Sequence, residues 1–226
     1  MSEYIIRILG RLRPPLTVEY QDIELPSFTI TVDKEIISAM PHPDLQFDAD
    51  EAQERLQEEI SPLLLVLGAK VEKHNIALEI SDVLYPTVGT ATRDVLCRAN
   101  LRDAPPAKDE LLLNAQWTKT DTTYRDLLEL YIEAQEAPNP RPAGAKMKER
   151  LKVRFHGYLP ALEQLGLQPD GFDFISKNQS QYKGDRHADF KIGEVPTQME
   201  PSKRLEILTL LKDFILCYEK YLLKST

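Results

Sequence analysis

The fold is decided at the end of the chain, where residues 202–223 read SKRLEILTLLKDFILCYEKYLL. Apolar side chains recur there at spacings of three and four residues, which is the period of one helical face. They are Leu208, Leu211, Ile215, Tyr218 and Leu222. Ser202 is suited to cap the first turn. Because one amphipathic helix is marginal in water, this face must pack on other helices, and the stretch predicts a helical bundle.

Shorter helical patterns precede this stretch. The first covers residues 124–134, with Thr122 or Thr123 as its cap, and a run of prolines ends it. A second helix is expected from about Ala145 to Val153. A third, shorter piece around residues 159–165 completes the predicted bundle.

The front of the chain reads differently, as a small unit with strands. In Phe28–Val32, apolar residues alternate with threonine, which is typical of a half-buried strand. Asp48 can cap a helix that starts at Ala49, in which Pro62 predicts a kink or a break. Further strands are expected at residues 4–9, 17–20, 76–80 and 95–101.

Residues 104–107 read APPA and open a predicted linker over residues 104–122. The predicted fold class is therefore α+β. A strand-rich N-terminal unit with one or two helices occupies residues 1–103, and an all-α bundle occupies residues 123–226.

The composition excludes several classes of protein. The chain has 226 residues, 42% of them hydrophobic and 28% charged, which is ordinary for a globular protein. A net charge of -8 argues against a protein that coats nucleic acid over its whole surface. No apolar run is long enough to predict a membrane span, and residues 1–12 show no secretion signal. We expect a cytoplasmic protein.

Common catalytic and cofactor motifs are missing from the sequence. It contains neither of the glycine-rich phosphate-binding patterns, and its histidines and cysteines do not have metal-binding spacing. We predict no cofactor and no metal, and we expect Cys97 and Cys217 to be buried free thiols.

One polar segment, residues 178–190 with the sequence NQSQYKGDRHADF, could carry chemistry. Arg186 can hold a phosphate, and His187 titrates near neutrality, so they are the candidate catalytic pair. The alternative is that both cap or ion-pair within the bundle. Ligand or RNA binding in this segment is assigned to Asn178, Lys183 and Asp189.

A second segment, residues 146–154, reads KMKERLKVR and is strongly basic. Lys146, Arg150 and Arg154 are spaced to lie near one face of a helix, where they could meet RNA or an acidic partner. The alternative is a solvated face with partners inside the protein.

The C-terminal half resembles the HEPN superfamily of small helical bundles. The likeness lies in YRDLLELYIEAQ at residues 124–135, RHAD at residues 186–189 and LTLLKDFILCYEKYL at residues 208–222. It implies a helical bundle that forms a homodimer. Many members are metal-independent ribonucleases that use an arginine and, four to six residues later, a histidine. Others have lost catalysis and serve as binding or scaffold modules.

The sequence departs from that catalytic spacing, because Arg186 and His187 are adjacent. Only Arg150 and His156 have the right separation, and they lie in and just after the basic segment instead. We therefore expect a catalytically degenerate, HEPN-like interaction or scaffold protein of a prokaryotic defence or toxin–antitoxin system, with its N-terminal unit recognising a protein partner. The alternatives are a metal-independent ribonuclease that uses Arg186 and His187, with RNA as its partner, and an enzyme with a site in the strand-rich part.

Overall fold

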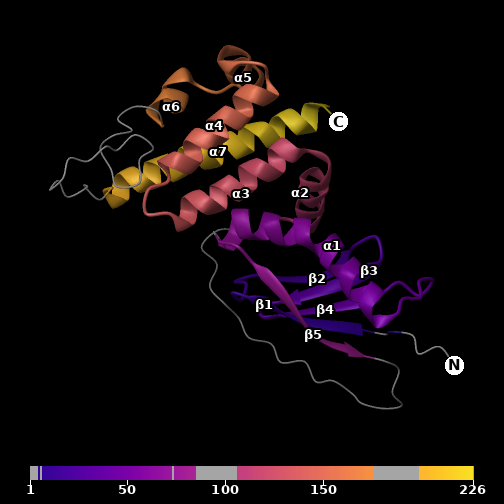
Figure 1. The fold of residues 1–226 in the computed structure, drawn as a ribbon. Coiled ribbons are helices and arrows are strands. Elements are labelled where there is room, and N and C mark those ends of the chain that lie inside the picture. Colours follow the sequence, from indigo (N-terminus) through magenta and orange to yellow (C-terminus); the bar gives the residue numbers. More distant parts are fainter. Residues whose placement is uncertain (1–4, 6, 73, 85–105, 176–198, 226) are drawn as a thin grey trace. The chain divides into compact units, whose positions relative to one another are not determined.

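The computed structural model describes residue 5 and residues 7–72, 74–84, 106–175 and 199–225 (Figure 1). The chain divides into two compact units, Met1–Gln116 and Trp117–Thr226. An antiparallel sheet comes first and most of the helices follow, so the predicted α+β class is confirmed.

A five-stranded sheet forms the N-terminal unit. Its strands are β1 (Arg7–Arg13), β2 (Glu19–Glu24), β3 (Phe28–Asp33), β4 (Ile36–Pro41) and β5 (Ala77–Leu84). They lie in the order β2-β3-β4-β1-β5, with antiparallel neighbours and with β2 and β5 at the edges. The alternation predicted for β3 is confirmed, since Phe28, Ile30 and Val32 are fully buried and the threonines between them are partly exposed.

Helix α1 (Ala49–Leu67) lies across one face of this sheet (Figure 1). Its predicted start is confirmed, because the Asp48 side chain accepts a hydrogen bond of 2.9 Å from the Glu51 amide. A break at Pro62 is not present, since the helix runs through this position to Leu67. Buried side chains on both sides of the proline hold the segment in place, and this packing outweighs the lost backbone hydrogen bond.

A buried carboxylate also connects α1 to the sheet. Glu59 accepts two hydrogen bonds from Ser27, one from the amide at 3.0 Å and one from the hydroxyl at 2.6 Å. Ser27 lies between β2 and β3, so this contact fixes their connection against the helix. Beyond α1 the chain continues as a π-helical turn, Gly68–Glu72.

The remaining described elements are helices. They are α2 (Lys108–Thr120), α3 (Thr122–Glu136), α4 (Arg141–Arg154), α5 (Tyr158–Leu165), α6 (Pro169–Phe174) and α7 (Pro201–Ser225). Most of the predicted linker, residues 104–122, is thus helical, and the boundary between the two units falls inside α2.

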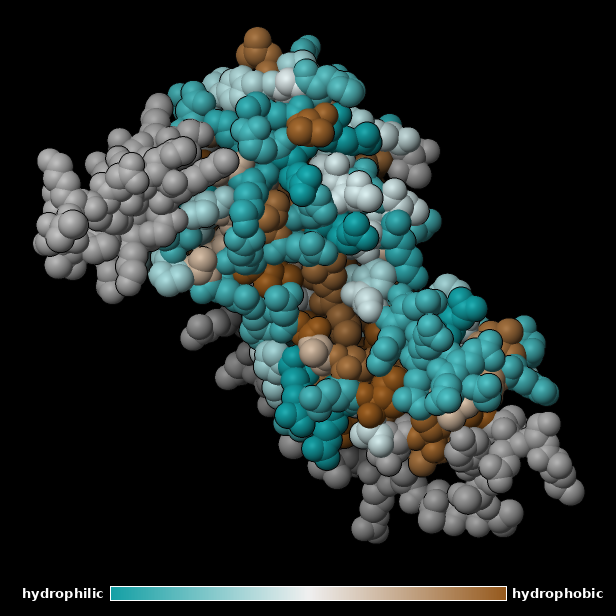
Figure 2. Space-filling model, viewed as in Figure 1, coloured by the Kyte–Doolittle hydropathy of each residue, from teal (hydrophilic) through white to brown (hydrophobic). Residues whose placement is uncertain are grey.

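Helices α3, α4 and α7 pack together as the core of the second unit. Most of the predicted apolar face of α7 is buried there, namely Leu211, Ile215, Tyr218 and Leu222, whereas Leu208 is only partly buried. Phe214, which was not predicted to belong to this face, is buried as well. Gly144 of α4 allows a close approach, because a Cβ at this position would lie 3.0 Å from a Leu211 methyl group. On the face seen in Figure 2, hydrophilic residues cover most of this unit.

Several boundaries differ from those predicted. Asp121, not a threonine, caps α3, and α4 begins at Arg141 rather than near Ala145. Helix α7 begins at Pro201, which places Ser202 inside its first turn. Strand β4 and helix α6 were not predicted. The strand expected at residues 95–101 lies outside the described residues.

Two further expectations concern the cysteines and the membrane. Cys217 is a free thiol, as predicted, but it is only partly buried. Cys97 lies outside the described residues. In the parts of the chain that the structure describes, no helix combines the length and apolar character needed to span a membrane.

Candidate functional site

The structure describes only one of the two segments predicted to carry function. Arg186, His187, Asn178, Lys183 and Asp189 all lie outside the described residues. The basic segment is described, and residues 146–154 form most of α4.

The three predicted contact residues of α4 each pair with a carboxylate of the α3 segment. Lys146 Nζ lies 2.7 Å from Glu133 Oε1, and Arg150 Nε lies 3.1 Å from Asp126 Oδ2. Arg154 Nη2 lies 3.6 Å from Asp121 Oδ2. Because α3 and α4 are neighbours joined by a short connection, acidic residues along one helix meet basic residues along the other.

The two other cations of the basic segment are also engaged. Lys152 pairs with Glu149 at 2.9 Å. The Lys148 ammonium donates to the Phe172 carbonyl at 3.0 Å and lies over the Phe172 ring, 5.2 Å from its centroid. Burial lowers the pKa of Lys148 below the usual lysine value. All five basic residues therefore have partners within the protein.

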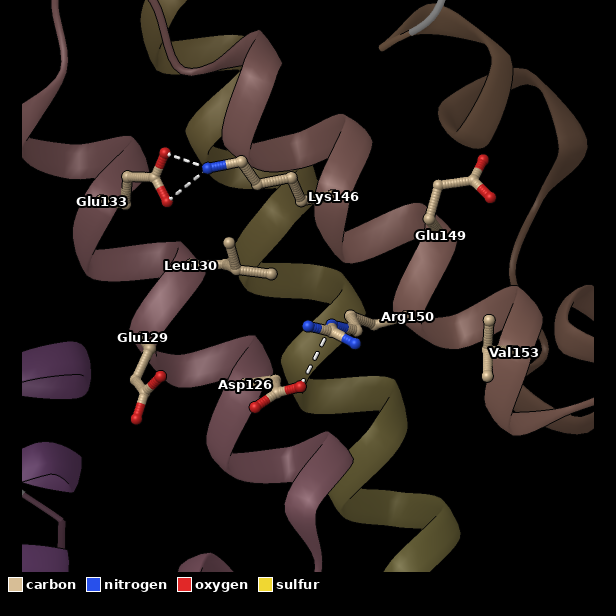
Figure 3. Close-up of a pocket in the computed structure, with 8 residues that line it drawn as sticks. All are labelled: Asp126, Glu129, Leu130, Glu133, Lys146, Glu149, Arg150 and Val153. Atoms are coloured by element: carbon tan, nitrogen blue, oxygen red, sulfur yellow. Dashed lines mark hydrogen bonds and ion pairs between the residues drawn. The ribbon is translucent and has the colours of Figure 1, made fainter.

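A groove of about 430 Å³ runs between α3 and α4 (Figure 3). Eight residues line it: Asp126, Glu129, Leu130, Glu133, Lys146, Glu149, Arg150 and Val153. The lining thus carries four carboxylates against two cations, an excess of two negative charges. We call it the α3–α4 groove.

The side chains of the α3–α4 groove have a clear arrangement. Leu130 lies between the two ion pairs, Lys146–Glu133 and Arg150–Asp126 (Figure 3). Glu129 and Glu149 point away from these pairs on opposite sides. Val153 is 72% exposed, although it is a branched apolar side chain. The groove thus offers apolar contact in a rim of negative charge.

At one end of α4, Arg154 joins a partly buried network. Its Nε donates to the Tyr218 hydroxyl at 3.1 Å, and that hydroxyl lies 3.1 Å from both Asp121 carboxylate oxygens. Burial is the main cause that raises the pKa of Tyr218 to about 12. Nearby, the Tyr124 hydroxyl donates to Glu219 at 2.6 Å. These groups satisfy one another, which is typical of a structural network.

Arg150 and His156, the pair with ribonuclease-like spacing, lie in different surroundings. Arg150, a residue of α4, forms an ion pair with Asp126 of α3. His156 is exposed and follows the end of α4 in the left-handed conformation, with a φ of 58°. The Gly157 amide donates to the Lys152 carbonyl and the His156 amide to the Val153 carbonyl, so His156 occupies the turn of a Schellman motif.

The N-terminal unit contains a second hollow, of about 380 Å³, between α1 and the start of β5. Its lining residues are Gln57, Ile60, Ser61, Leu64, Leu65, Asn75, Ile76, Ala77 and Leu78. None of them is charged. We call it the α1–β5 groove.

Sequence reasoning found the cations of the α3–α4 groove but not its carboxylates. The spacing of Asp126, Glu129 and Glu133 at three and four residues was the available signal, since it places them on one helical face. No known protein family, curated protein or solved structure matched this chain. The resemblance of its C-terminal half to HEPN bundles stays a prediction.

Proposed function

We propose that the protein is a non-catalytic, HEPN-like interaction module, and that its α3–α4 groove binds a basic, amphipathic segment of a partner protein. One observation carries the proposal: Lys146, Arg150 and Arg154 of α4 are neutralised by carboxylates of the α3 segment, and the groove lining retains an excess of carboxylates.

This charge distribution argues against RNA on the same surface. Binding to phosphates depends on lysine and arginine side chains that replace the counterions of the nucleic acid. Here Lys146, Arg150 and Arg154 each lie within 4 Å of a carboxylate already. A phosphate would have to displace that carboxylate and would meet Glu129 and Glu149 beside it.

The same groove suits a basic amphipathic helix. Leu130 and Val153 offer apolar contact, and apolar side chains at helical spacing could reach them. Lysine or arginine residues of the partner would pair with Glu129 and would compete with Lys152 for Glu149, with which Lys152 forms an ion pair of 2.9 Å. Charge complementarity of this kind raises association rates and excludes acidic competitors.

The test compares two fluorescein-labelled probes by anisotropy: an amphipathic helical peptide of leucine and lysine, and a short polyuridine RNA. The wild-type protein should bind the peptide, and more weakly as salt rises, because the contacts are exposed. It should neither bind nor cleave the RNA. Binding or cleavage of the RNA, or no binding of the peptide, would overturn the proposal.

Charge reversal locates the site. The double variant Glu129→Lys/Glu149→Lys should weaken peptide binding roughly tenfold or more, because it replaces attraction by repulsion. The matched control is Glu163→Lys/Glu206→Lys, which changes the net charge equally at two exposed positions outside the groove. Equal losses in both variants would show nonspecific attraction to an acidic protein and would contradict the proposal.

A further inference from the structure

The two edges of the N-terminal sheet differ. Strand β2, at one edge, is interrupted between Tyr20 and Ile23, where Asp22 has a φ of 51°. The Asp22 carbonyl accepts a hydrogen bond from the Lys108 ammonium, and the Tyr20 hydroxyl donates to the Pro106 carbonyl at 3.3 Å. Irregularity and side-chain cover of this kind protect an edge against pairing with another strand.

Strand β5, at the other edge, is the longest of the five, with eight residues. Among the described strands, it pairs only with β1. Its register shifts after Ile80, so the first half, Ala77–Ile80, is regular and pairs residue by residue with Arg13–Gly10. A regular edge strand presents a row of backbone donors and acceptors on its outer side, which is a template for one more strand.

The α1–β5 groove lies beside this regular half. Leu78 and Ile76 line it from the strand side and are only partly buried, while Ile60 and Leu64 line it from α1. Its polar lining residues are uncharged amides and a hydroxyl. A groove without charged lining residues selects against charged side chains, because they would lose water without gaining a partner of opposite charge.

We propose that this edge and groove bind an extended, uncharged segment of another protein. The segment adds to β5 as a sixth strand and directs every second side chain, aliphatic in character, into the α1–β5 groove. Backbone hydrogen bonds to Ala77–Ile80 supply the affinity, and the groove supplies the selectivity. This site is separate from the α3–α4 groove and does not depend on the function proposed for it.

A second copy of the chain is a poorer occupant than a foreign segment. Strand β5 has the sequence ALEISDVL, with two acidic residues and no basic one. Pairing of two copies through β5 would bring two acidic strands together, and like charges that face each other across a strand pair are destabilising. An uncharged strand avoids this repulsion.

The probe for the test is an uncharged heptapeptide, acetyl-Ser-Thr-Val-Thr-Ile-Thr-Ser-amide, titrated into the full-length ¹⁵N-labelled protein. We expect saturable shifts of the amide signals of Ala77–Ile80 and of α1 residues that line the groove. Methylating the backbone nitrogens of one alternate set of peptide residues should abolish binding. Methylating the other set should leave it within a fewfold, because only one set faces β5. Equal effects of the two sets would overturn the proposal.

Variants of the protein provide a second test of the same proposal. Ser61→Lys places a charge in the groove and should weaken binding at least tenfold. Gln53→Lys makes the same change on α1 outside the groove and should leave binding unchanged. Absence of saturable shifts in the wild type would overturn the proposal. So would full hydrogen-exchange protection of the outward-facing amides of Ala77–Ile80 in the free protein, because the chain would then cover the edge itself.

Discussion

The hydroxyl of Tyr218 lies 3.1 Å from each carboxylate oxygen of Asp121. The same carboxylate accepts a hydrogen bond of 2.8 Å from the Tyr124 amide and thereby caps α3. Arg154 adds an ion pair from the end of α4. One side chain thus fixes the start of α3, the end of α4 and the middle of α7 in the same place.

Replacing Asp121 by alanine should therefore cost about 2–3 kcal/mol of folding free energy, because a helix cap and a buried hydrogen bond are lost together. The control is Asp126→Ala, which removes an exposed ion pair with Arg150 and should cost less than about 1 kcal/mol. Trp117 is the only tryptophan and packs on Tyr124, so its fluorescence during urea unfolding follows this unit. Similar costs for the two variants would contradict the role given to Asp121.

The pKa of Tyr218, raised to about 12 mainly by burial, predicts a loss of stability in alkali. Below pH 10 the phenol is neutral in both the folded and the unfolded chain, so its contribution is fully present. Above pH 10 the unfolded chain ionises first, and the contribution falls until pH passes about 12, by roughly 2–3 kcal/mol in total. Urea unfolding followed by Trp117 fluorescence between pH 9 and 12 should show a shallower decline in Tyr218→Phe than in the wild type.

His156→Gly should stabilise the protein by about 1 kcal/mol. His156 holds a φ of 58°, a conformation that costs most residues about 1–2 kcal/mol and glycine almost nothing. Its side chain is exposed, so little packing is lost. His156→Ala removes the imidazole but leaves a residue with a Cβ in the strained backbone conformation, so it should not raise stability. Thermal unfolding of both variants checks this prediction, and an equal rise in melting temperature for alanine would contradict it.

Glu59→Ala should destabilise the N-terminal unit by about 2–4 kcal/mol. Both Ser27 donors would lose the carboxylate that accepts from them, and unsatisfied buried donors are costly. Glu59→Gln retains an acceptor oxygen, so it should destabilise the unit less than Glu59→Ala does. Glu58→Ala, on the exposed side of the same helix, should change stability by no more than about 0.5 kcal/mol. Hydrogen exchange of the β3 amides reports on this unit, and unchanged protection in Glu59→Ala would disprove the claim.

Local periodicity was enough to predict the elements whose buried face repeats regularly. Residues 28–32, α1 and α7 are of this kind; the first two bury their whole predicted face, and α7 buries all of it except Leu208. Strand β4 escaped prediction because its sequence, IISAMP, does not alternate: Ile36 is 49% exposed while Ile37 is fully buried. This segment is a strand because it pairs with β1 on one side and β3 on the other, and local sequence does not reveal that pairing.

Prediction of the candidate site from sequence was limited in the same way. The cations of α4 were visible as a run of charge, but their effect depends on carboxylates of a neighbouring helix. Sequence cannot show that Lys146 meets Glu133 and Arg150 meets Asp126, because this match follows from how α3 and α4 pack. The charge run alone favoured a solvated face with partners inside the protein, and it left contact with RNA or an acidic partner as the other interpretation.

The contrast between β2 and β5 has a consequence for assembly. Sheets that stack edge to edge in a head-to-tail manner need two open edges on every copy, and such contacts propagate into filaments. Here the β2 edge is interrupted at Asp22 and covered by Lys108, so a strand that joins β5 finds no continuation on the far side. The β2 edge therefore protects the sheet against head-to-tail growth of copies of this chain into filaments.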